Sequence, residues 1–176
     1  MRESISAGAA GATAAPPLAD FVAAYLDAWN SHDADRLLAH MTPDVVYDDS
    51  AWPETMRGHD DVRRFLEHAW RAFPDMRFEL LEGPYRLGED KAAFWWRGEG
   101  TMTGRLDPPG FAPTGRRWRV DGADFHAYRD GLISRLRIIF NLAEASQQLG
   151  LMPTPGSRAV RIAAALQRVE TRFKRR

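Results

Sequence analysis

The sequence predicts a cone-shaped single α+β domain, in which three N-terminal helices pack on a curved antiparallel sheet and enclose a pocket. Apolar residues recur at helical spacing through the first third of the chain and alternate, as in strands, from residue 76 onward. The chain has 176 residues, of which 44% are hydrophobic and 11% aromatic, enough for one aromatic-rich core. Helices followed by a strand meander indicate an α+β domain.

Two helices are predicted at the start of this domain. Residues 18–31 carry an apolar stripe with a period of 3.6 residues, which is typical of a helix packed on a core. A second, short helix is expected to include residues 37–41, with Ser31 or Asp33 as its N-cap and Pro43 as its end.

A strand and a third helix follow. Residues 45–47 read Val-Val-Tyr, a β-favouring run that leads into Asp48 and Asp49. Neighbouring side chains of a strand point to opposite faces, so only one of these two carboxylates can enter the cone. Gly58 begins a third amphipathic helix, which Pro74 ends.

The second half of the chain changes to strands. The Asp130-Gly131 pair predicts a tight hairpin turn, residues 106–115 form a loop rich in Pro and Gly, and residues 143–149 form a closing helix. Four strands are expected, over residues 76–87, 92–103, 118–128 and 132–140.

The termini differ from this central domain, which we place at residues 18–152. Residues 1–17 contain almost no large apolar side chain and are expected to form a flexible tail. Residues 157–176 form a basic amphipathic helix, with seven Lys or Arg and only Glu170 as an acid. This helix packs on its own body or on a second subunit, contacts a membrane surface or an acidic partner, or is a frayed tail.

Composition excludes several classes of function. Lys plus Arg and Asp plus Glu both number 24, so the zero net charge argues against a general nucleic-acid binder. No run approaches the ~18 apolar residues of a membrane span, and we expect no membrane association. The absence of cysteine excludes disulfides and thiolate sites, and fits a reducing cytoplasm, where we expect the protein.

No cofactor or metal is expected. The five histidines show no HxxxH spacing, and no cysteine assists them. The sequence also contains neither a GxGxxG fingerprint nor a phosphate-binding loop, and no serine lies in a nucleophile elbow.

The element order and several phrases resemble the nuclear-transport-factor-2-like superfamily, in particular its SnoaL-like polyketide cyclases and its ketosteroid isomerases. The superfamily also includes limonene epoxide hydrolases. The phrases, which fall within residues 18–152, are FVAAYLDAWNSHDADRLLAHMTPDVVYDD, GHDDVRRFLEHAWRAFPDMRFE, PPGFAPTGRRW, DFHAYRDGLI and QQLGL. The resemblance implies a cofactor-independent isomerase or cyclase that acts by proton transfer on a hydrophobic polycyclic or polyketide-like carbonyl compound.

The resemblance also implies a catalytic set. Asp49 takes the place of the proton-abstracting Asp of a ketosteroid isomerase, Asp124 that of its neutral, proton-donating acid, and Tyr25 that of its oxyanion-binding Tyr. Each has a structural alternative: a solvated loop carboxylate for Asp49, an ordinary core tyrosine for Tyr25, and a structural hydrogen-bond acceptor for Asp124. His126 shares the strand face of Asp124 and is either a second proton carrier or a partner at the pocket rim.

One departure separates this chain from SnoaL-type cyclases. The position of their acid/base Asp on the last strand falls on Ile138, which favours an isomerase-like site. The alternatives to an acid/base enzyme are a noncatalytic module that binds a hydrophobic ligand and an epoxide hydrolase. We expect a small hydrophobic molecule to contact Trp29, Phe94, Trp96, Met102, Trp118, His126, Ile138 and Phe140.

A homodimer is expected through the outer face of the sheet. Alternation along the second predicted strand places Trp95, Arg97 and Glu99 on that face. An exposed tryptophan among charges is typical of an interface.

Overall fold

The computed structural model describes residues 17–173, with side chains up to residue 168. The expected N-terminal tail, apart from residue 17, and the last basic residues lie outside this part of the chain. The elements are α1 (Leu18–Ser31), α2 (Ala34–Leu38), β1 (Met41–Asp49), β2 (Met56–Arg57), α3 (Gly58–Ala72), β3 (Arg77–Arg86), β4 (Lys91–Thr101), β5 (Arg117–Arg129), β6 (Leu132–Phe140), α4 (Leu142–Gln148) and α5 (Arg158–Phe173).

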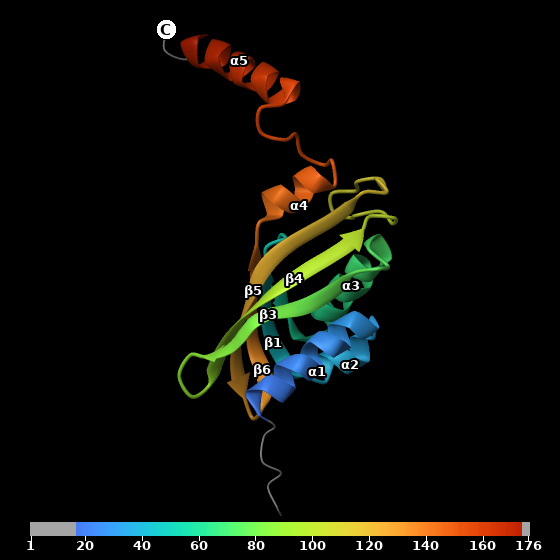
Figure 1. Cartoon of the computed structure of the whole chain (residues 1–176), viewed down its shortest axis with the longest axis vertical. Helices are drawn as coiled ribbons and strands as arrows, with labels where there is room; N and C mark the ends of the chain where they lie inside the picture. Colours follow the sequence, from blue (N-terminus) through green and yellow to red (C-terminus); the bar gives the residue numbers. More distant parts are fainter. Residues whose placement is uncertain (1–16, 174–176) are drawn as a thin grey trace, which may run out of the picture.

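One curved sheet forms the frame of the molecule. Its strands lie in the order β2-β1-β6-β5-β4-β3, with β3 to β6 as an antiparallel meander and β1 parallel to β6. The sheet curves around α1, α2 and α3, which cover one of its faces (Figure 1). This confirms the predicted α+β cone.

Local sequence explains the helix boundaries. The apolar stripe of α1 buries Val22, Tyr25 and Trp29, and α1 ends where His32 adopts a left-handed conformation, with φ of 55°. The Asp33 side chain caps α2 by accepting hydrogen bonds from the backbone N–H groups of residues 35 and 36, at 2.9 and 3.2 Å.

The end of the second helix was predicted wrongly. α2 ends at Leu38, and both Met41 and Pro43 belong to β1. The pairing of β1 with β6 shifts register between Met41 and Val46, so Pro43 lies where the ladder is irregular. The missing backbone N–H of proline therefore breaks no regular hydrogen bond of the ladder. Strand β2 was not predicted either, because two residues are too short to show a periodic pattern.

The strands separate an apolar inner face from a charged outer face. Along β4, Phe94 and Trp96 are buried against the helices, whereas Trp95 is 45% exposed on the opposite face. Glycine gives the inner aromatic rings room to lie close to the sheet. A Cβ at Gly122 would lie 2.4 Å from the Trp96 ring, and one at Gly98 would lie 2.7 Å from Phe78.

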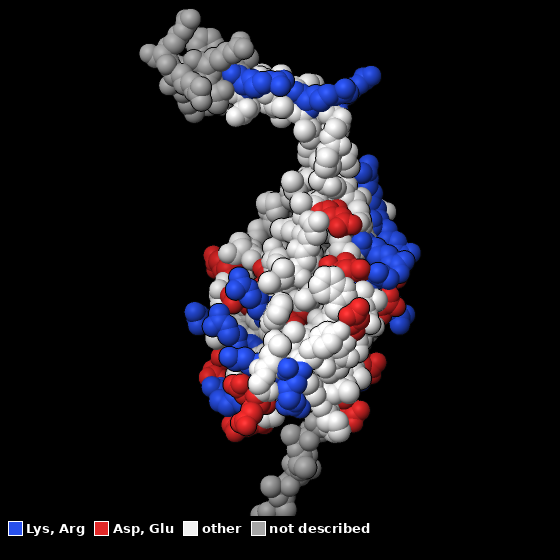
Figure 2. Space-filling view, turned by 60° about the vertical axis from the view of Figure 1, so that its left-hand side comes forward, with Lys and Arg blue, Asp and Glu red and all other residues white. Residues whose placement is uncertain are grey.

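Helix α5 stands clear of the body in Figure 1, beyond α4, rather than packing on it. Basic side chains follow its length in Figure 2, while Ile162 and Leu166 are 62% and 66% exposed. Among the described helices, none is long and apolar enough to span a bilayer.

Candidate active site

A deep apolar pocket opens between the inner face of the sheet and the helices. Its walls come from α1, α3, the strands, the loop after β4, and α4. The empty space, which includes open solvent at the mouth, is about 1090 Å³. Two carboxyl groups, those of Asp49 and Asp124, interrupt the apolar lining.

Asp49 ends β1 with its side chain in the pocket. Its Oδ1 accepts a hydrogen bond from the backbone N–H of Ala51 at 2.7 Å, and the Tyr47 hydroxyl approaches its Oδ2 at 3.5 Å. Burial raises the pKa of Asp49 from 3.8 to about 7, and the nearby Asp124 adds to the rise, although the two hydrogen bonds oppose it. A carboxyl group with this pKa is suited to act as a general base near neutral pH.

Asp124 lies in the middle of β5 and is only 2% exposed. The Trp96 indole N–H donates to its Oδ1 at 2.6 Å. The Tyr25 hydroxyl donates to its Oδ2 at 3.3 Å, and the His126 Nε2 lies 3.3 Å from the same oxygen. Three side chains therefore fix the orientation of this carboxyl group. The contact of Trp96 depends on Gly122, which leaves room for its ring.

Tyr25 is fully buried beside Asp124. It accepts a hydrogen bond from the Trp29 indole N–H at 2.9 Å. Burial raises the pKa of Tyr25 well above its usual value, and the charge of Asp124 raises it further. The hydroxyl therefore keeps its proton at neutral pH, and it donates this proton to Asp124 at the pocket wall.

The structure gathers most of the predicted site residues around this pocket. Phe94 and Met102 are instead packed in the core, and His126 lies behind Asp124; these three are not among the lining residues. Phe94 faces the His126 ring, at 5.1 Å between centroids, rather than the hollow. The predicted residues that line the pocket are Tyr25, Trp29, Asp49, Trp96, Trp118, Asp124, Ile138 and Phe140.

Several lining residues were not predicted. Trp52 lies in an irregular turn after β1, where no periodicity indicates its direction, and its ring packs on Phe65 of α3 at 5.4 Å. Leu106 and Pro108 come from the Pro- and Gly-rich loop, whose path only the folded chain defines. For Phe65 the helical stripe indicated burial, but not a place in the pocket wall.

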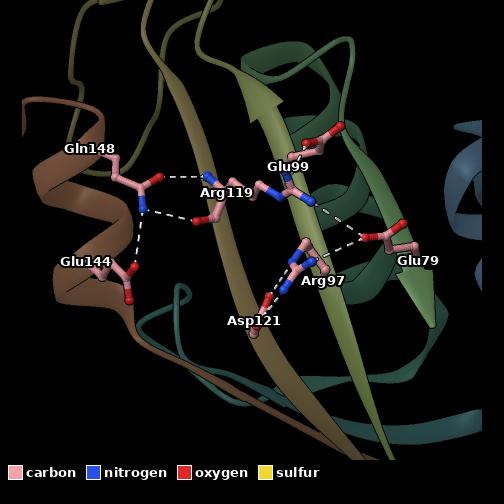
Figure 3. A network of polar contacts seen from close by, with 7 residues as sticks. All are labelled: Glu79, Arg97, Glu99, Arg119, Asp121, Glu144 and Gln148. Carbon is pink, nitrogen blue, oxygen red and sulfur yellow. Dashed lines mark hydrogen bonds and ion pairs between the residues drawn. The ribbon is translucent and has the colours of Figure 1, made fainter. Parts of the chain in front are cut away.

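Side-chain hydrogen bonds fix two of the elements that line the pocket, α4 and the loop after β4. The Gln148 amide binds both backbone groups of Arg119 on β5: it accepts from the N–H at 2.7 Å and donates to the C=O at 3.0 Å (Figure 3). This fixes α4, whose Ala145 lines the pocket. On the other side, the Asp107 backbone N–H donates to Nε2 of His68 at 3.1 Å, which fixes the loop.

The outer face of the same strands carries ion pairs. Arg97 binds both oxygens of Asp121, at 2.6 and 2.9 Å, and also approaches Glu79 at 3.7 Å (Figure 3). Arg97 and Glu99 thus face away from the pocket, and its described lining includes no Lys or Arg. In the described part of the chain, no three His, Asp or Glu side chains gather as a metal site would require.

Fold and site together define a class of protein, the small α+β cones that hold carboxyl groups in an apolar pocket. Within that class, the chain belongs to the SnoaL-like domain family, whose model matches residues 22–136. No curated protein matches the sequence.

Solved structures share the fold at low identity. AclR from Streptomyces galilaeus, a proposed hydroxylase, is 21% identical with a TM-score of 0.66, over 90% of this chain and 96% of its own. IdmH from Streptomyces antibioticus, a proposed polyketide cyclase, is 24% identical with a TM-score of 0.62, over 75% and 97%. A protein from Catenulispora acidiphila with a ketosteroid isomerase-like fold is 19% identical with a TM-score of 0.63, over 74% and 92%.

Proposed function

We propose that this protein is a cofactor-independent acid/base enzyme, an isomerase or cyclase, that acts on a hydrophobic polycyclic or polyketide-like carbonyl compound. The observation that carries the proposal is the pair Asp49 and Asp124 in one apolar pocket, with the pKa of Asp49 raised to about 7. The family supports a reaction of this kind.

In this proposal Asp49 removes the proton next to the substrate carbonyl. The electron pair of the broken C–H bond moves to the carbonyl oxygen, which becomes an enolate oxygen. Asp124, in the protonated form that this proposal assigns to it, donates a hydrogen bond to this oxygen, where the negative charge develops. Tyr25 donates a second hydrogen bond once its hydroxyl turns from Asp124 to the substrate oxygen. Return of the proton from Asp49 to another carbon gives an isomer, and attack of the enolate carbon on a second carbonyl group closes a ring.

Epoxide opening has less support in this pocket. The described lining of the pocket includes no Lys or Arg, and Arg97 of the Arg97-Gly98-Glu99 phrase is bound to Asp121 on the outer face of the sheet. The other alternative is a module that binds a hydrophobic ligand without catalysis. A negative result in the following experiment would favour this alternative.

The test uses 2-tetralone, a bicyclic ketone with acidic α-protons, in D₂O. The wild-type protein should accelerate deuterium incorporation, measured by mass spectrometry. Asp49→Asn keeps the size of the side chain but removes the proton acceptor, so the rate should fall by roughly 10²–10⁴-fold.

Asp48→Asn is the matched control, since this carboxyl lies on the other face of the sheet, bound to Thr55 at 2.6 Å and Arg135 at 3.1 Å. It should keep the wild-type rate. If Asp49→Asn exchanges as fast as the wild type, or if the wild-type protein does not accelerate exchange at all, the proposed function is wrong.

A further inference from the structure

We propose that His126 and Tyr128 form a proton relay behind Asp124, which connects this pocket carboxyl to the end of the body opposite α4. The proposal rests on the acid/base function above and deepens it, because it says how Asp124 gains the proton that it donates to the substrate oxygen while a ligand fills the pocket. His126 and Tyr128 are positioning residues that act through Asp124 and do not touch the substrate.

The three residues form a continuous row on the inner face of β5. Residues 124, 126 and 128 alternate along the strand, so their side chains share one face. The His126 side chain is fully buried, with Nε2 3.3 Å from Oδ2 of Asp124 and Nδ1 3.0 Å from the Tyr128 hydroxyl. Both ring nitrogens are therefore engaged, one toward the pocket and the other away from it.

The row ends at a side chain that is only partly buried. Tyr128 lies next to the Asp130-Gly131 turn that joins β5 to β6. Burial raises its pKa, the charge of Asp124 raises it further, and Arg86 lowers it in part. Tyr128 therefore keeps its proton at neutral pH and can pass one on only while it takes another from water.

The proposed relay starts from one resting arrangement of protons. In this proposed arrangement, the Tyr128 O–H donates to Nδ1 of His126, and the ring carries its own proton on Nε2 and donates it to Asp124. To protonate Asp124, the Nε2 proton moves to Oδ2, the Tyr128 proton moves to Nδ1, and water supplies a proton to Tyr128. The imidazole changes tautomer and the phenol is regenerated. The net change is the transfer of one proton from water to Asp124, which leaves hydroxide in the solvent. The reverse sequence removes it.

A route behind Asp124 is needed because the pocket side closes. Leu106 and Leu149 line the pocket with other apolar side chains, so a hydrophobic ligand that fills it excludes water from the carboxyl group. Proton exchange through the mouth would then require the ligand to leave. The relay bypasses the ligand.

The surroundings of His126 favour a defined path. Its ring meets Tyr25 of α1 edge-on at 5.0 Å, and Leu136 of β6 lies directly across from it. The titratable groups that face it are Asp124 and Tyr128 on its own strand and Tyr25 on α1. Tyr25 already donates to Asp124, so Tyr128 is the contact that leads away from the pocket.

The first test is the pH profile of 2-tetralone deuterium exchange. His126→Gln keeps hydrogen-bonding atoms but cannot relay a proton, and Tyr128→Phe keeps the ring that packs on Phe21 at 5.3 Å. Both should lower kcat by about 10–100-fold, as outer partners of a reacting group do, with KM unchanged. Both should also alter the pH profile of kcat.

Leu136→Met is the control, because it changes packing against His126 without adding or removing a proton carrier. It should keep both kcat and the pH profile of the wild type. If His126→Gln and Tyr128→Phe also keep them, while the wild-type protein catalyses exchange, the relay is overturned and the proposed function stands.

The second test does not depend on turnover. Ring ¹⁵N NMR shifts of the wild-type protein should place the neutral His126 proton on Nε2. In Asp124→Leu, Nε2 has no acceptor, so the proton should move to Nδ1, where the Tyr128 oxygen can accept it. A proton on Nδ1 in the wild type, or an unchanged tautomer in the variant, would overturn the relay even if no ketone is turned over.

Discussion

Asp48 and Asp49 are adjacent at the end of β1, yet they lie on opposite faces of the sheet and their pKa values are shifted in opposite directions. On the outer face, hydrogen bonds from Thr55 and Arg135 lower the pKa of Asp48, because they stabilise its charge. On the inner face, burial raises the pKa of Asp49 to about 7. The same residue type is thus an ion-pair partner on one face and a candidate base on the other.

Strand β5 repeats this contrast. Asp121 on the outer face binds Arg97 through both oxygens, and this contact lowers its pKa. Asp124, three residues later, points into the pocket, where Trp96, Tyr25 and His126 surround it and no Lys or Arg is among the described lining residues. The face of the sheet, rather than the residue type, decides whether a carboxyl group is neutralised by a cation or kept for chemistry.

The largest effect expected on β5 tests this contrast. Asp124→Leu removes a donor from the developing oxyanion and should lower the exchange rate by roughly 10²–10³-fold. Asp124→Asn should cost less, because an amide can still donate a hydrogen bond. Tyr25→Phe should fall between the two, and its effect should not add fully to that of Asp124→Leu, since both donors serve one oxygen.

Asp121→Asn is the control on the outer face and should leave the exchange rate unchanged. An equal loss in Asp121→Asn and Asp124→Leu would show that the rate follows general stability of β5 rather than a donor in the pocket. Steady-state exchange rates and circular dichroism of the four variants separate these outcomes.

The next effect concerns stability against pH. A carboxyl whose folded pKa is raised binds its proton more tightly in the folded state, so its contribution to stability falls as pH rises from about 4 to about 7. Asp49→Asn abolishes this fall and should be more stable than the wild type at pH 8, by on the order of a few kcal/mol.

Asp48→Asn should behave oppositely. Its lowered pKa means that the charged form stabilises the folded state above the unfolded pKa, and this stability is lost as pH falls. The variant should lose less than about 1 kcal/mol at pH 8, since the ion pair lies near the surface. Urea unfolding at pH 5 and pH 8 measures both; a lower stability of Asp49→Asn at pH 8 would contradict the comparison.

The last comparison concerns the outer face as an interface. Trp95, Phe125 and Ile139 are 45%, 42% and 48% exposed there, and Trp95 and Ile139 are both in register with Ala123. We expect this strip to join two copies of the chain. Trp95→Lys should weaken the dimer by roughly 30-fold, the loss of one interface hot spot.

Phe111→Lys is the control for this prediction, because Phe111 is 40% exposed but lies in the loop between β4 and β5 rather than on these strands. It should leave the dimer intact. Light scattering at micromolar concentration measures both variants, and a monomeric wild-type protein would contradict the expected dimer.

Much of the frame follows from the sequence alone. Helical spacing predicted α1 at its observed bounds, and alternation predicted β6 and that Asp48 and Asp49 lie on opposite faces. These features depend on the period of the backbone, which apolar residues reveal directly. The resemblance to a family also brought Tyr25, Asp49 and Asp124 together before any geometry was known.

Other features were decided only by the tertiary structure. Pro43 entered β1 because the parallel partner β6, far along the chain, allows an irregular ladder there. Trp52 and Leu106 joined the pocket from loops that have no period to read. The sequence shows that Asp124, His126 and Tyr128 are spaced two residues apart and so share one face of a strand. Their burial, however, comes from α1 and the neighbouring strands. A sequence pattern indicates which way a side chain points, whereas the elements packed against it decide whether water reaches it, and that sets its chemistry.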